Sequence, residues 1–241
     1  MVASPGGPGG RDRVRSLVGF GVVVVIAGLL ALGVWQLERR AWKHDLIARV
    51  DARLAAAPVA APGPADWPAV SRERDEYRRV EATGRLLHDR EIPVQAVTAR
   101  GPGYWILTPL ETPGFTLLVN RGFVPQDRRD PATRPAGQVA GEVVVTGLLR
   151  LTEPGGGFLR ANDPAAGRWY SRDVAAIAEA GGLGATAPYF IDADATPNPG
   201  GLPVGGLTVI HFRDSHLSYA LTWFALAAGL AAAVGIVRRR R

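Results

Sequence analysis

Two uncharged stretches, one near each end of the chain, constrain the fold more than any other feature of the sequence. Residues Ser16–Leu37 and Leu217–Val237 each run for more than 20 positions without a charged side chain. A helix of roughly 20 apolar residues crosses about 30 Å of hydrocarbon. We therefore predict transmembrane helices over residues 16–37 and 215–237, with everything between them on one side of the membrane. The alternatives are a cleaved signal peptide at the first stretch and a buried core helix at the second.

Basic residues at the two ends predict the orientation. Arg11, Arg13 and Arg15 precede the first stretch, and four arginines at 238–241 end the sequence. Short arginine-rich tails stay on the cytoplasmic side of a membrane. We expect both tails, residues 1–15 and 238–241, in the cytoplasm and the central segment on the outer face.

Composition narrows the range of functions. Much of the net charge of +6 comes from the termini, where arginines suit anionic lipid headgroups. The central segment has no basic stripe interleaved with aromatic residues, so we expect membrane lipids as partners and no nucleic acid. The chain has no cysteine, which excludes disulfides and thiolate metal sites. Its richness in Ala, Gly, Arg and Pro is typical of a GC-rich bacterial genome.

Between the two stretches, the spacing of apolar residues predicts a helix, a linker and a β-rich domain. Apolar residues at helical spacing indicate that the first helix extends over residues 38–57. Proline, alanine and glycine are frequent in residues 58–76, which predicts a linker. From residue 77 to 214 the apolar period changes to two, as in half-buried strands.

The β-rich segment contains a series of short strand candidates and one helix. The strand candidates are residues 80–86, 92–96, 104–110, 115–124, 143–151, 168–172, 189–192 and 207–212, and the helix is Val174–Ala180. Pro113-Gly114 predicts a type II turn between two of the strands. The predicted fold class is an α+β membrane protein, in which two transmembrane helices flank one small antiparallel β barrel or sandwich-like domain with a short helix.

The sequence contains no recognisable catalytic motif. It has no phosphate-binding loop and no Gly-x-Ser-x-Gly elbow, and its four histidines form no His-x-x-x-His pair. Asp192 and Asp194 are candidates for paired carboxylates, but we interpret them as surface charges in a loop. We therefore predict that the chain is not an enzyme.

Several segments carry a resemblance to a known family. They are Leu32–Lys43, Leu118–Pro125, Gly147–Glu153, Asn162–Pro164, Trp169–Asp173, Tyr189–Ala193 and His216–Phe224. In this order they resemble the Surfeit locus protein 1 family, whose members assist assembly of haem-copper cytochrome c oxidase. One departure is Asp214-Ser215, which stands where the family usually has an asparagine.

The resemblance implies an assembly factor of the bacterial inner membrane with its β domain in the periplasm. It implies the large oxidase subunit as a partner, with haem a synthase as a further candidate. It also implies transient binding of haem a, with a histidine at the head of the second span as the iron ligand. His216 matches that position.

Helical spacing places Tyr219, Ala220, Trp223 and Ala227 below His216 on one face. Two aromatic residues and two alanines would offer a flat apolar surface to a porphyrin. The alternative is an ordinary interfacial histidine beside an aromatic belt, in a scaffold that binds oxidase subunits without haem.

Arginines near the same interface are candidates for binding the haem propionates. They are Arg39, Arg40 and Arg213. A guanidinium group forms paired hydrogen bonds with a carboxylate. Snorkelling of these side chains to lipid phosphates is the alternative for Arg39 and Arg40.

Asn120, Arg121 and Gly122 form a second candidate site, which we assign with Trp35 to partner binding. Docking of an oxidase subunit is one interpretation of this segment. The favoured interpretation is structural: Gly122 takes a positive φ in a bulge, and Arg121 stacks on Trp105 or Tyr104.

Overall fold

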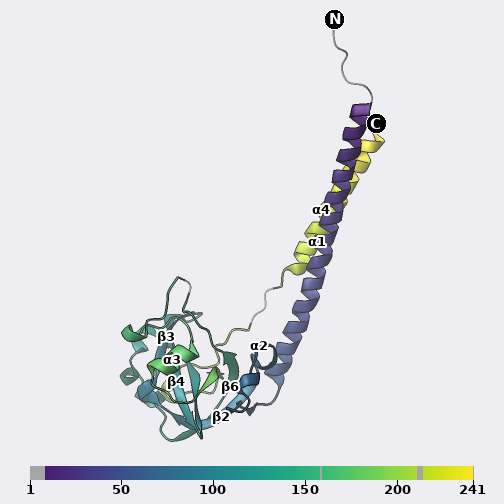
Figure 1. Ribbon diagram of the computed structural model, residues 1–241. Helices are drawn as coiled ribbons and strands as arrows, with labels where there is room; N and C mark the ends of the chain where they lie inside the picture. The colour runs from purple at the N-terminus through teal and green to yellow at the C-terminus, as the bar shows by residue number, and fades with distance from the viewer. Residues whose placement is uncertain (1–8, 158, 211–213, 241) are drawn as a thin grey trace. The chain divides into compact units, whose positions relative to one another are not determined.

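The computed structural model describes residues 9–157, 159–210 and 214–240 (Figure 1). These residues fall into two compact units, residues 9–49 with 214–240, and the described residues of 50–210. The first unit is helical and the second is β-rich, which confirms the predicted α+β class.

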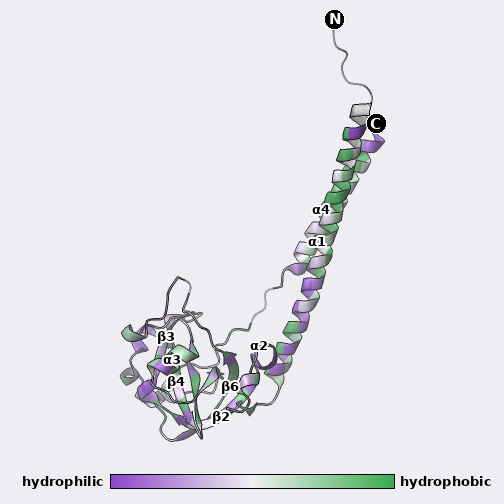
Figure 2. Ribbon diagram, in the orientation of Figure 1, coloured by the Kyte–Doolittle hydropathy of each residue, from purple (hydrophilic) through white to green (hydrophobic). Residues whose placement is uncertain are grey.

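The helical unit pairs two long helices, α1 (Gly9–Ala55) and α4 (His216–Arg239). Both are long and apolar enough to cross a membrane, and Figure 2 shows the apolar residues concentrated along them. Close packing depends on Gly33, because a Cβ atom there would overlap the Phe224 ring. Ala220 and Ala227 are buried on the facing side of α4. Small residues of this kind let helix backbones approach closely in lipid.

Helix α1 continues well beyond its apolar stretch. It ends at Ala55, close to the predicted end of the extension and before Pro58, which lacks the N–H group needed to continue a helix. Beyond its apolar stretch, α1 carries the charged residues that were expected at the membrane interface.

The described residues of the β-rich unit form seven strands in one sheet. They are β1 (Val59–Ala60), β2 (Arg79–Leu86), β3 (Ile92–Thr98), β4 (Gly101–Thr112), β5 (Phe115–Pro125), β6 (Glu142–Leu151) and β7 (Thr186–Ala193). Their order is β1-β2-β6-β7-β5-β4-β3, and β2 also pairs with β4. That extra pairing closes β2, β6, β7, β5 and β4 into a small barrel. Most pairs are antiparallel, but β5–β7 and β1–β2 are parallel.

Alternation along the strands separates two cores. Leu117, Val119 and Tyr189 belong to one cluster, whereas Leu118 and Phe190 belong to the other. Adjacent residues of a strand point to opposite faces of a sheet, so one cluster fills the barrel and the other lies outside it. Helix α3 (Val174–Ala180), at the predicted residues, covers the outer cluster.

The predicted strand at 168–172 is wrong, and the one at 207–212 is wrong over the residues that the structure describes. Within Arg168–Arg172, only isolated bridges form, at Arg168 and Trp169. The amide N–H groups of Tyr170 and Ser171 donate instead to the Asn162 side chain, at 2.8 and 3.2 Å, so a side chain replaces the ladder. Residues 207–210 are irregular, and the rest of that candidate lies outside the described residues.

The segment at 58–76 is more structured than the linker that we predicted. It contains β1, a short 3₁₀ helix at Trp67–Ala69 and helix α2 (Arg72–Asp75). Trp67 packs edge-on against Phe115 at 5.6 Å, and Pro62 accepts a hydrogen bond from the buried Tyr189 hydroxyl at 2.6 Å. The segment is therefore packed against the barrel.

Candidate functional site

His216 is the first residue of α4 and is bound to α1 by one side-chain hydrogen bond. Its Nδ1 lies 2.8 Å from Oε1 of Gln36. Because an amide oxygen accepts, Nδ1 donates this hydrogen bond. No hydrogen bond joins Nε2 to any residue in the described part of the chain. A ring fixed through one nitrogen with the other free is the usual arrangement of a metal-binding histidine.

Asp214, two residues before His216, contacts both α1 and α4 at this end of the helix pair. Its carboxylate accepts from the His216 backbone N–H at 3.1 Å and lies 2.8 Å from Nε2 of His44, with Arg40 3.8 Å away. The hydrogen bond from the His216 N–H, followed by that from His44, lowers the pKa of the Asp214 carboxyl group. The departure from the family pattern at this position thus supplies a charged acceptor for the start of α4.

The structure separates the residues that were predicted to form one flat surface. Ala220 and Ala227 are buried against α1, whereas Tyr219 is exposed and Trp223 is half-buried. A porphyrin plane therefore fits only the exposed side, next to Tyr219 and Trp223. The free imidazole nitrogen and this aromatic side together suit a haem group.

The other candidate site residues near the membrane interface differ in their contacts and in their exposure. The Arg39 guanidinium lies over the Trp42 ring at 4.7 Å. Arg40 is half-buried beside Asp214, and Trp35 is exposed on α1. Arg213 lies outside the described residues.

Asp192 is the centre of a buried ionic cluster in the β-rich unit, so the prediction that it is a surface charge is wrong. Its side chain is only 3% exposed. It accepts hydrogen bonds from Arg150 (2.9 Å), Arg172 (3.0 Å), Asn120 (2.7 Å) and Thr208 (2.9 Å). Both carboxylate oxygens are thereby saturated, and the cluster joins β5, β6 and β7.

Each arginine of this cluster also stacks on an aromatic ring and binds a second acid. Arg150 lies over Tyr77 at 4.9 Å and donates to Glu76, while Arg172 lies over Phe190 at 4.8 Å and donates to Glu153. A cavity of about 480 Å³ borders the cluster, between Trp105 and the segment at 206–209. Because both oxygens of Asp192 are saturated by its partners, the cluster serves to hold the strands together; the buried Glu76 accepts from Arg150 through Oε1 alone.

Asn120 and Arg121 point to opposite faces of β5 and are both buried. We expected Arg121 to stack on Trp105 or Tyr104, and this prediction is wrong. Its guanidinium donates instead to the Gly137 carbonyl and, at 2.7 Å, to the Asn198 side chain. Burial lowers the pKa of Arg121 to about 10.

Gly122 has a φ of +126°, as predicted, and a Cβ atom there would overlap the Val204 carbonyl. All three residues therefore have packing roles. A role for them or for Trp35 in partner docking stays a prediction.

Four residues that contribute to these two sites were not predicted from the sequence: Gln36, His44, Arg150 and Arg172. For Gln36 a signal existed, since a polar residue within an apolar span usually faces a neighbouring helix. For the arginines there was none, because the acid that they share, Asp192, is 42 and 20 positions away in the sequence.

Comparison with known proteins places the chain among its relatives. The model of the SURF1 family matches residues 23–228. The chain is 38% identical to Surfeit locus protein 1 of Rattus norvegicus over 224 residues, which cover 86% of this chain and 71% of the rat protein. It is also 38% identical to the human protein over 215 residues (82% and 69%) and to a SURF1-like protein of Monosiga brevicollis over 226 residues (87% and 83%). The chain belongs to the Surfeit locus protein 1 family.

Proposed function

We propose that this chain is a membrane-anchored, non-enzymatic assembly factor for haem-copper cytochrome c oxidase, which assists delivery of haem a to the large oxidase subunit. The observation that carries the proposal is the imidazole of His216, oriented by Gln36 and free at Nε2. Family membership and the two apolar helices support the assembly role and the membrane anchoring.

Four residues besides His216 would hold the haem. Tyr219 and Trp223 would pack against the porphyrin, and Arg39 and Arg40 would pair with its propionates. When bound, the haem supplies the redox-active iron that the oxidase needs. The role of this chain is to hold that group at the outer membrane surface without reacting with it.

The proposed location is the bacterial inner membrane, with both termini in the cytoplasm and the β-rich unit in the periplasm. The arginines at both ends of the sequence support this orientation. The proposed partners are membrane lipids, the large oxidase subunit and haem a synthase.

The decisive experiment compares two histidines at the same end of the helix pair. His216→Ala and His44→Ala are purified from membranes of cells that make haem a, and the visible absorption spectrum gives the haem content per chain. We expect His216→Ala to lose most of the haem, because the iron ligand is gone. We expect His44→Ala, whose ring already has Asp214 as its partner, to retain it.

A second readout separates the haem carrier from a haem-independent scaffold. Oxidase activity of the membranes is measured for the same two variants. Equal haem content in both variants, with normal oxidase assembly, would refute the ligand role and leave the scaffold as the function.

A further inference from the structure

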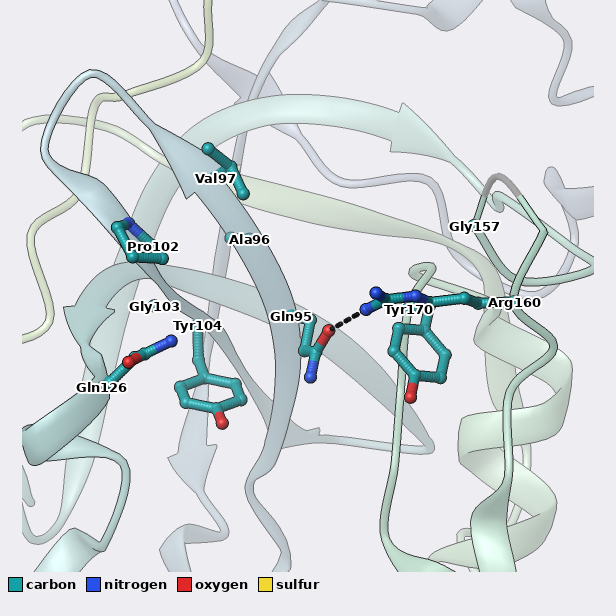
Figure 3. Close-up of a pocket in the computed structure, with 10 residues that line it drawn as sticks. All are labelled: Gln95, Ala96, Val97, Pro102, Gly103, Tyr104, Gln126, Gly157, Arg160 and Tyr170. Atoms are coloured by element: carbon teal, nitrogen blue, oxygen red, sulfur yellow. Dashed lines mark hydrogen bonds between the residues drawn. The ribbon is translucent and has the colours of Figure 1, made fainter.

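The open edge of β3 lies beside a groove that neither the family nor the proposed function explains. The groove has a volume of about 530 Å³ and is lined from β3 by Gln95–Val97, from β4 by Pro102–Tyr104, and from the following loops by Gln126, Arg160 and Tyr170. Figure 3 shows Tyr104 and Tyr170 on the two sides of β3 and the hydrogen bond that joins Gln95 to Arg160.

Strand β3 is the last strand of the sheet, and only part of its outer edge is paired. The Gln95 N–H points away from β4, because it donates to the Trp169 carbonyl at 2.8 Å. Alternate residues of a strand direct their peptide groups to the same side. The N–H and C=O of Val97 therefore also point outward, and neither is hydrogen-bonded to another residue that the structure describes.

Two apolar side chains are exposed, one on β3 and one in the loop that is hydrogen-bonded to β3. Val97 is 87% exposed, and Leu159, which adjoins Arg160 in the loop, is 89% exposed. A strand edge that is both unpaired and apolar is a template for pairing with another chain. Edge strands of natural proteins are usually protected by charged side chains or by a covering segment. We therefore expect a partner to cover this edge.

The charge around the groove indicates the chemistry of that occupant. Arg129 lies over the Tyr104 ring at 5.1 Å, and Arg160 lies over the Tyr170 ring at 5.5 Å. Their hydrogen bonds go to uncharged oxygens, those of the Gly167 carbonyl and the Gln95 amide. Within the described residues neither arginine has an acidic partner, in contrast to Arg150 and Arg172. Each guanidinium is therefore positioned on an aromatic ring with its charge unneutralised.

We propose that an extended, acidic polypeptide segment of a partner protein binds here by adding a strand to the open edge of β3. Its backbone would pair with Val97, its apolar side chains would contact Val97 and Leu159, and its carboxylates would meet Arg129 and Arg160. Main-chain pairing supplies affinity in this mode, and the flanking side chains supply specificity. The proposal does not depend on haem binding or on His216.

The test uses the full-length protein in nanodiscs and a fluorescein-labelled peptide with the repeat Glu-Val over eight residues. Binding is followed by fluorescence anisotropy. We expect saturable binding, weakened about fivefold by each of Arg129→Gln and Arg160→Gln, as for a partly exposed ion pair. The matched control Arg85→Gln, which removes an exposed arginine already paired with Glu111, should bind as the unaltered protein does.

Two altered peptides leave the protein intact and so avoid any effect on folding. A Gln-Val repeat tests the charge, and a Glu-Val repeat with N-methyl groups on alternate residues, made in both registers, tests the backbone pairing. At least one methylated register should lose most of the binding. No saturation up to millimolar peptide, or binding of both methylated peptides as tight as that of the unmethylated peptide, would overturn strand addition. Equal binding of the Gln-Val peptide would overturn the acidic preference.

Discussion

The end of the helix pair and the buried cluster around Asp192 use polar side chains in opposite ways. In the cluster every hydrogen-bonding position of Asp192 is taken by Arg150, Arg172, Asn120 or Thr208. At the helix end, His216 has one nitrogen bound to Gln36 and no hydrogen bond at the other within the described chain. A saturated group holds a structure together, whereas an oriented group with one free position is available to a ligand. The difference separates residues that stabilise the fold from residues that are available to bind a ligand.

The largest expected effect on stability is in the buried cluster around Asp192. Asp192→Ala leaves two buried arginines without their shared acid, and we expect a loss of about 3–5 kcal/mol in the free energy of unfolding. Denaturant unfolding followed by tryptophan fluorescence measures it. The control Asp127→Ala removes an exposed acid and should change stability by less than about 0.5 kcal/mol. Equal effects of the two substitutions would show that the cluster around Asp192 does not stabilise the fold.

A smaller effect is expected at Gly122, where backbone conformation and close packing combine. Gly122→Ala places a Cβ atom both at a positive φ and against the Val204 carbonyl, so we expect a loss of about 3 kcal/mol. Gly114→Ala is matched to it, because Gly114 has a φ of +96° and open space around it. We expect about 1 kcal/mol there, and thermal unfolding compares the two. Similar melting temperatures would mean that the contact with Val204 contributes nothing.

On the unsaturated side, removing the partner that orients His216 should weaken haem binding and leave the fold intact. Gln36→Leu keeps His216 but releases its ring, and we expect about tenfold lower haem affinity, as for other groups that orient a metal ligand. Haem titration followed by absorbance measures this. Val34→Leu, on the exposed side of α1, is the control. Unchanged affinity in Gln36→Leu would show that ring orientation does not matter.

The smallest effect concerns the titration of Asp214. Its pKa lies below the ordinary 3.8, so its contribution to stability is present above that value and is lost as pH falls through the lowered pKa. His44→Ala removes one cause of the shift, and the titration midpoint should move upward. Carbon-13 NMR of the Asp214 carboxyl group measures the midpoint. A midpoint unchanged in His44→Ala would assign the shift to the His216 N–H alone.

Local patterns were sufficient to predict much of the fold. Helix α3 and strands β2 to β7 were predicted close to their observed positions, because the signal for each lies within its own sequence. Strand β2 alternates between buried and exposed residues, whereas β5 is a largely buried run that follows the turn at Pro113-Gly114. The positive φ of Gly122 was also predicted correctly, because glycine adopts this conformation readily in a bulge. The strand candidate at 168–172 failed because the Asn162 side chain, from outside the window, binds its amide groups.

By itself the sequence determined the two long apolar helices, the β-rich segment between them and the position of His216 at the start of α4. These depend on composition and on neighbours along the chain. Only the tertiary structure decided that β2 pairs with β4 to close the barrel, that Asp192 is buried among arginines, and that Gln36 orients His216. Each of these contacts joins residues at least 20 positions apart in the sequence. No local period records such a pairing, because its free energy arises only when the folded chain removes both partners from water or holds them in place.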